Sequence, residues 1–114
     1  MQVRIDTQNF ELNEKQEHAL RKKMQKLGRL CKRFGSGLVD LHLHLSRKRP
    51  PEGFVTKVNL SVPNKQMASE TKNKVFNLSI GAAFKKVMAQ LRNYRGHLQK
   101  AKSFAEVAKE RGKL

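Results

Sequence analysis

The sequence has one cysteine, few acids and no long apolar run, and each shortage excludes a class of protein. A single cysteine excludes an internal disulfide and any cysteine-rich zinc module. No apolar stretch approaches the roughly 20 residues needed to span a bilayer, and the N-terminus lacks the apolar segment of a signal peptide. We therefore expect a cytoplasmic protein with neither a disulfide nor a membrane anchor.

The shortage of acids has the largest consequence, because only 9 Asp and Glu accompany 25 Lys and Arg. The resulting net charge of +16 at pH 7 fits a polyanionic partner, with nucleic acid first and an anionic membrane surface second. The length of 114 residues with 38% hydrophobic content is enough for one domain with a core and too short for two. A single nucleic-acid-binding domain is the expectation.

Basic residues first gather on a predicted helix over residues 13–34. Apolar residues recur there at steps of four and three, which is one face of a helix: Leu20, Met24, Leu27, Cys31 and Phe34. Basic residues recur at the same steps on the other side: Lys22, Lys26, Arg29 and Arg33. From His18 to Val39 there are seven Lys or Arg and no acid, so like charges repel along this face. An anionic partner would relieve that repulsion.

The ends of this helix also carry signals. Asn13 is a candidate N-cap, with Gln16 as its partner in a capping box. Residues 35–37, Gly-Ser-Gly, predict the end of the helix. Cys31 lies on the apolar stripe, so we expect a buried side chain and not a nucleophile.

Alternating apolar and polar residues predict four strands. They cover residues 3–7, which should be half-buried, and residues 39–45, 54–62 and 66–71. The first two strands flank the helix as a crossover unit, so we expect them to be parallel. The loop over residues 46–53 carries Arg47-Lys48-Arg49 followed by two prolines, which keep it from pairing.

A second predicted helix repeats the acid-free pattern, with no acid between Thr71 and Ala105. It begins at a cap, Asn77 or Ser79, or one turn earlier. Its apolar stripe consists of Ile80, Ala83, Phe84, Val87, Leu91, Tyr94 and Leu98. A capping box at residues 103–106 predicts that residues 103–114 form a tail or a short separate helix after a domain of residues 1–102.

The predicted order β-α-β-β-β-α indicates an α+β domain of two layers. Two helices with one apolar face each can share one side of a four-stranded mixed sheet. Both basic stripes then point outward on the helix side and form one broad positive surface.

Two other functions compete with this interpretation. His42 and His44 share a strand face with Asp40, and three such ligands would suit a metal-dependent nuclease. No other nearby acid or Cys completes a metal shell, so the polar outer face of a strand is favoured. A double-stranded-RNA-binding module has the order α-β-β-β-α, and the opening strand counts against it. We expect no catalytic residue, metal or cofactor.

Three segments resemble the ribosome hibernation-promoting factor family, also called ribosome-associated inhibitors or sigma-54 modulation proteins. Residues 3–12 resemble the family's first strand, and residues 23–27, Lys-Met-Gln-Lys-Leu, are similar to its Lys-apolar-x-Lys-Leu segment. Residues 80–91 resemble its Ala-Ile-Asp…Lys-Leu…Arg-Gln-Leu motif, and the likeness covers about residues 2–100. Gly81, Ala89 and Asn93 depart from the pattern, which usually has an acid, Arg and Lys there.

The resemblance implies a translation inhibitor of the stress response that binds the small ribosomal subunit. It would occupy the channel of mRNA and of the A- and P-site tRNAs, in competition with both, as a monomer without the dimerisation domain of long-form members. Its chief contact would be 16S-type rRNA, with no membrane involved. The residues expected to bind rRNA are Lys22, Lys23, Lys26, Arg29, Arg33, Arg47, Lys48, Arg49, Lys85, Lys86, Arg92, Arg95 and Lys100.

Overall fold

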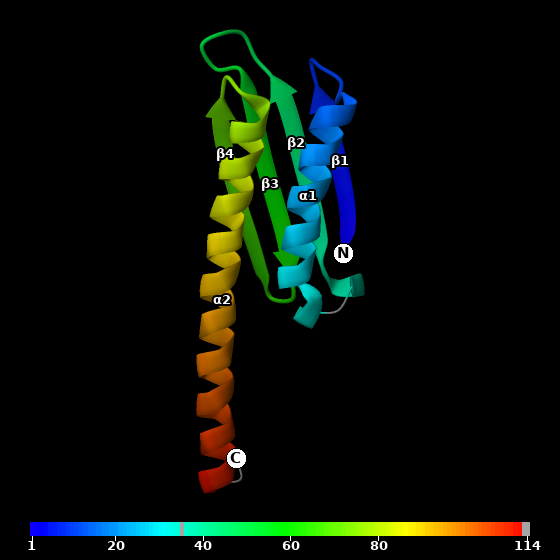
Figure 1. Cartoon of the computed structure of the whole chain (residues 1–114). Helices are drawn as coiled ribbons and strands as arrows, with labels where there is room; N and C mark the ends of the chain where they lie inside the picture. The colour runs from blue at the N-terminus through cyan, green and yellow to red at the C-terminus, as the bar shows by residue number, and fades with distance from the viewer. Residues whose placement is uncertain (35, 113–114) are drawn as a thin grey trace.

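A four-stranded mixed sheet carries two α-helices on one face (Figure 1). The computed structural model describes the backbone of residues 1–34 and 36–112, and the side chains of residues 1–32, 34 and 37–94. The strands are β1 (Gln2–Gln8), β2 (Asp40–Arg47), β3 (Phe54–Val62) and β4 (Lys65–Asn73), and the helices are α1 (Glu14–Leu30) and α2 (Phe76–Gly112). This confirms the predicted α+β order.

The sheet has the spatial order β1-β2-β3-β4, with β1 parallel to β2 and the other pairs antiparallel. The parallel pair confirms the predicted crossover through α1. In register, Leu43 lies between Ile5 of β1 and Val58 of β3, and the side chains of Leu43 and Val58 are fully buried. Val3 and Ile5 remain 43% and 38% exposed, more than the half-buried pattern predicted. The reason is that β1 is an edge strand with a neighbour on one side only.

Helix α1 begins as predicted and ends earlier than predicted. The Gln16 backbone N–H donates to Asn13 Oδ1 (2.8 Å), and the Asn13 N–H donates to Gln16 Oε1 (3.0 Å), which completes the capping box. The helix ends at Leu30 and not at Phe34, because the chain winds more tightly from Cys31 onward. Two short 3₁₀ helices follow, over Lys32–Phe34 and Ser36–Leu38, so the predicted stop signal lies beyond the true end. Gly35 is outside the described residues.

Helix α2 begins at Phe76, so neither Asn77 nor Ser79 caps it. Ser79 is instead fully buried, and its hydroxyl bonds to the hydroxyl of Thr56 on β3 (2.8 Å). Thr71 of β4 donates to the carbonyl oxygen of Ser79 (2.6 Å), so this serine links the helix to two strands. The capping-box pattern at residue 103 does not start a separate helix, since α2 runs unbroken to Gly112 and extends past the sheet (Figure 1).

The core lies between the helices and the sheet. Leu20, Leu27 and Cys31 of α1 are buried, which confirms the expectation for the cysteine, while Met24 and Phe34 pack at the margin. The predicted stripe of α2 is buried from Ile80 to Leu91. Its next member, Tyr94, is half-buried, stacks on Phe34 and donates its hydroxyl to the Pro63 carbonyl oxygen (3.0 Å). The side chain of Leu98 lies outside the described part.

Candidate nucleic-acid interface

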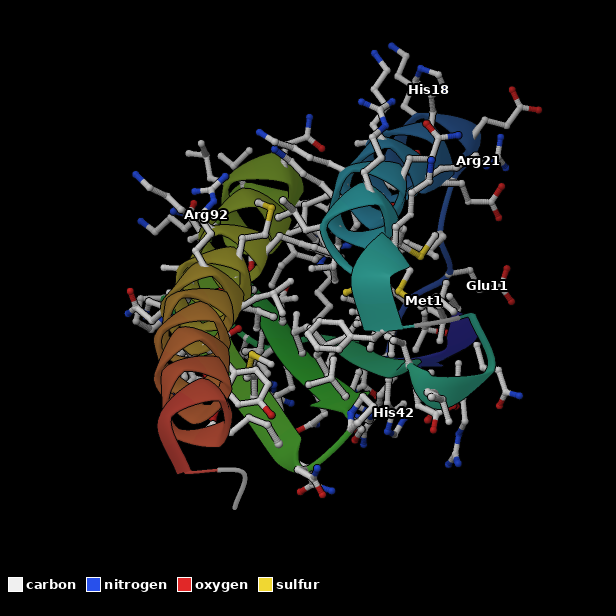
Figure 2. All side chains as sticks on the ribbon, turned by 90° about the horizontal axis from the view of Figure 1, so that it is seen from below. Met1, Glu11, His18, Arg21, His42 and Arg92 are labelled. Carbon is white, nitrogen blue, oxygen red and sulfur yellow. The ribbon has the colours of Figure 1, made fainter. Side chains whose placement is uncertain are left out.

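Burial of one stripe of α1 leaves its basic residues in solvent. Lys22, Lys26 and Arg29 are exposed, on the side of the helix away from Leu20 and Leu27. The side chain of Arg33 lies outside the described part of the chain. Figure 2 views the helices from one end and shows the labelled His18 and Arg21 of α1 pointing away from the sheet.

Helix α2 adds a second row of cations on the same side of the molecule. Lys85, Lys86 and Arg92 are exposed, because Phe84, Val87 and Leu91 take the face toward the sheet. In Figure 2, Arg92 lies on the helix side. The predicted contacts Arg95 and Lys100 lie on α2, but their side chains are outside the description. The helix-side basic surface is defined here as Lys22, Lys26, Arg29, Lys85, Lys86 and Arg92.

A groove separates the two helices next to this surface. Its volume is ≈ 350 Å³, and its walls are Ala19, Lys22, Lys23 and Lys26 of α1 with Asn77 and Ile80 of α2. All three lysines line the groove, with Lys23 half-buried and Lys22 and Lys26 exposed to solvent. Three ammonium groups beside a shallow groove suit a phosphate backbone, which is recognised chiefly by charge and shape.

The acids lie elsewhere, which separates the charges of the two faces. In the described side chains of α1 and α2, carboxylates occur only in the first turn of α1, at Glu14 and Glu17. The face of the sheet away from the helices, called the open face, carries both signs. Asp6 and Glu70 alternate there with Lys57, and Figure 2 shows His42 on this side. Beyond these two carboxylates at the start of α1, the described part of the two helices therefore presents cations without anions.

The loop Arg47-Lys48-Arg49 is placed apart from the helix-side basic surface. It lies at the end of the sheet after β2, where Figure 1 shows the loop between β2 and β3. All three side chains are exposed, and the Arg47 guanidinium lies 5.6 Å from the centroid of the Phe54 ring. Among the described side chains, the structure thus places the predicted helix residues on one side of the molecule and gives the loop residues a separate location.

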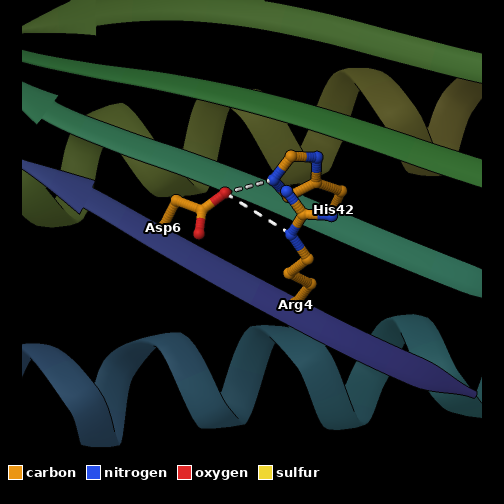
Figure 3. A network of polar contacts seen from close by, with 3 residues as sticks. All are labelled: Arg4, Asp6 and His42. Atoms are coloured by element: carbon orange, nitrogen blue, oxygen red, sulfur yellow. Dashed lines mark hydrogen bonds and ion pairs between the residues drawn. The ribbon is translucent and has the colours of Figure 1, made fainter.

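His42 has a different acidic neighbour from the one predicted. Its Nε2 lies 2.6 Å from Asp6 Oδ2, and Arg4 Nε lies 3.6 Å from the same oxygen, as Figure 3 shows. The sequence pattern had grouped His42 with Asp40, because it cannot reveal which residue of β1 stands opposite. Within the described residues no group of three or more His, Cys, Asp or Glu could hold a metal ion. The cluster links two parallel strands at the sheet edge.

This link makes a pH prediction. The hydrogen bond from His42 lowers the pKa of Asp6, desolvation opposes part of this shift, and the nearby Arg4 guanidinium lowers the pKa further. A depressed pKa means that the carboxylate stabilises the fold above its unfolded pKa, and that this is lost as pH falls through the folded pKa. We expect His42→Ala to raise the pKa of Asp6 toward its ordinary value, measured by NMR titration of its carboxyl carbon.

His44→Ala is the matched control, because the charge of His44 is the smallest influence on Asp6. It should move the pKa of Asp6 far less than His42→Ala does. Equal shifts in the two variants would mean that the hydrogen bond in Figure 3 is not formed in solution.

Sequence reasoning assigned no role to two residues beside the basic loop, Gln8 and Asn9. Parallel pairing sets Gln8 opposite Ser46 at the end of β2, so both amides border the loop. The backbone of Asn9 has φ +67°, a conformation that asparagine tolerates better than most residues. A crossover connection predicts parallel strands but not their register, so no sequence signal identified this neighbourhood.

Comparisons with solved structures agree with the fold. The chain is similar to the Protein Y N-terminal domain of Thermus thermophilus, with a TM-score of 0.64 and 18% identity, covering 82% of this chain and 99% of that one. It is also similar to a ribosomal subunit interface protein of Coxiella burnetii, with a TM-score of 0.69 and 14% identity, covering 84% and 99%. Comparison with curated protein sequences finds no match.

A family model matches most of the chain. The model is that of the sigma 54 modulation protein / S30EA ribosomal protein, and it covers residues 3–99. In the part of the chain that the structure describes, no helix is long and apolar enough to cross a membrane. The chain therefore belongs to the sigma 54 modulation protein / S30EA ribosomal protein family, whose members are ribosome-associated hibernation and modulation factors and not enzymes.

Proposed function

We propose that this protein is a cytoplasmic translation inhibitor that occupies the mRNA channel and the A- and P-site tRNA positions of the small ribosomal subunit. The helix-side basic surface would face the 16S-type rRNA, and the body of the domain would exclude mRNA and tRNA. Silencing of idle ribosomes under stress would follow from occupancy alone. This inhibition needs no covalent bond to be made or broken.

The observation that carries the proposal is the unpaired charge of the helix-side basic surface. None of its six cations forms an ion pair within the described residues, whereas Arg4 and Lys72 outside it do. The unpaired Lys and Arg side chains of the two neighbouring helices repel one another, and binding to a phosphate surface removes this repulsion. Counterions released from the rRNA supply the main part of the affinity.

The firm packing of the two helices on the sheet suits a protein that blocks a channel sterically. Helices α1 and α2 are fixed by buried residues such as Leu27 and Phe84, and by the polar link from Ser79 to β3 and β4. A rigid surface loses little conformational entropy on binding, so its charges are already placed for the phosphates. A monomer of this kind can fill a channel without any contribution from a second copy.

Cosedimentation with purified small subunits at increasing salt tests the proposal. Each phosphate neutralised contributes about −0.7 to −0.9 to the slope of log affinity against log salt. If each member of the helix-side basic surface neutralises one phosphate, the slope should be about −4 to −5. Salt-independent binding would contradict the proposal. Tighter binding to a bare RNA duplex than to small subunits would favour a double-stranded-RNA-binding module instead.

A further inference from the structure

A cleft at the end of the sheet lies outside the helix-side basic surface. It has a volume of ≈ 720 Å³, and its walls include Gln8, Asn9, Ser46 and residues 47–50. Figure 1 shows β1 and β2 ending together here, beside the loop that leads to β3. A volume of this size falls within the range of small-molecule sites.

The cationic wall of the cleft has no acid of its own. Its basic residues are Arg47, Lys48 and Arg49, and none of them forms an ion pair with a described carboxylate. The one acid of the loop, Glu52, pairs instead with Lys72 on β4, with Oε1 3.6 Å from Nζ. Arg47 is held beside the cleft by its position over the Phe54 ring. A phosphate group is the partner that these cations lack.

The loop is held by its backbone, which leaves its side chains free for a ligand. The Lys48 N–H donates to the Gly53 carbonyl oxygen (2.7 Å) and closes the loop. Gly53 has φ +72°, and a Cβ there would lie 2.8 Å from the carbonyl oxygen of Asn73, so the loop is packed closely against the end of β4. The basic side chains are therefore carried by a fixed frame.

Two side-chain amides complete the cleft. Gln8 and Asn9 are exposed, and neither side chain forms a hydrogen bond with another described residue. Each amide offers both donors and an acceptor, which is what the edge of a nucleotide base requires. Cations for a phosphate and unpaired amides for a base thus border the same space.

We propose that this cleft binds one unpaired nucleotide of RNA, with its phosphate on the basic wall and the edge of its base on the amides of Gln8 and Asn9. The proposal deepens the function above, and rests on it for the choice of RNA as the polymer. Double-stranded RNA does not fit, because its base edges are paired and its major groove is too narrow for side chains. Phosphate contacts position a protein and base contacts specify where it binds, so the cleft would fix the register of the protein on folded rRNA.

NMR of the ¹⁵N-labelled full chain tests the cleft directly. The probes are single-stranded hexamers of uridylate, adenylate and cytidylate, a short RNA duplex, and inorganic phosphate. The single strands should shift the side-chain amide signals of Gln8 and Asn9. The affinities of the best and the worst hexamer should differ about tenfold, equivalent to about 1.4 kcal/mol in binding free energy. The duplex and phosphate should leave those amide signals in place. Equal shifts with phosphate would reduce the cleft to a simple anion site and overturn the proposal.

A variant with Gln8→Ala and Asn9→Gly should bind all three hexamers equally, because the base contacts are gone and the cations remain. Glycine is chosen at residue 9 because it accepts the positive φ. Gln66→Ala is the matched control, since Gln66 is an exposed amide on β4 away from the cleft. Unchanged discrimination in the double variant would overturn the proposal. Failure of the wild type to bind small subunits would refute the proposed function separately, since the hexamers are tested without ribosomes.

Discussion

Reversal of Lys22, Lys26 and Arg29 to Glu is expected to abolish cosedimentation with small ribosomal subunits while leaving the thermal unfolding transition nearly unchanged. All three side chains are exposed and form no ion pair within the described residues, so the fold does not depend on them. Exposed pairs contribute only about 0–1 kcal/mol even where they exist. Binding loses three cations and gains three anions against phosphate, so the effect on affinity should be large.

The matched control reverses the same number of charges on the open face, at Arg4, Lys57 and Lys72. The net charge falls equally in both variants, but at physiological salt a charge acts over only about 8 Å. The control should therefore retain most of the binding. Equal loss of binding in the two variants would mean that net charge and not the helix-side basic surface determines binding. Full binding by the variant with Lys22, Lys26 and Arg29 reversed would exclude that surface as the site.

Leu27→Ala should have the largest effect on stability and little effect on binding by the folded protein. The Leu27 side chain is fully buried between α1 and the sheet. Truncation loses buried area and leaves a cavity, at a cost of about 2–5 kcal/mol in the free energy of unfolding. For a chain of this size the melting temperature should fall by about 8–20 °C. Chemical denaturation measures the loss in the free energy of unfolding, and cosedimentation with small subunits at low temperature measures binding by the folded protein.

Gln25→Ala is the control on the same helix, because Gln25 is exposed. Its cost should stay within about 0.5 kcal/mol. A Leu27→Ala protein as stable as wild type would show that α1 does not dock through this stripe in solution.

Local signals in the sequence were sufficient to predict the order of helices and strands. The cap at Asn13, the alternation along β3 and the spacing from Ile80 to Leu91 each predicted an element that the structure contains. Each of these signals spans only a few residues, and each predicts the same helix or strand that the packed structure contains. The crossover rule then gave the parallel pair β1–β2.

Features that depend on tertiary contacts were not predictable. The early end of α1 follows from the tight turn at Cys31, which brings the Phe34 ring onto Tyr94. Ser79 looked like a cap and is a buried hydrogen-bonding residue, since its partners come from β3 and β4. The placement of Gln8 depends on a parallel register that alternation alone does not specify. The helix residues of the candidate site were predicted as a group, whereas the cleft was not.

Occupancy of small subunits in the presence of mRNA and initiator tRNA is the measurement that bears most directly on the central claim. Small subunits are first saturated with labelled protein, and mRNA with initiator tRNA is then added at increasing concentration. If the protein occupies the channel, bound protein falls as bound tRNA rises, and the subunit never carries both. Subunits that retain the protein together with mRNA and initiator tRNA would contradict the account.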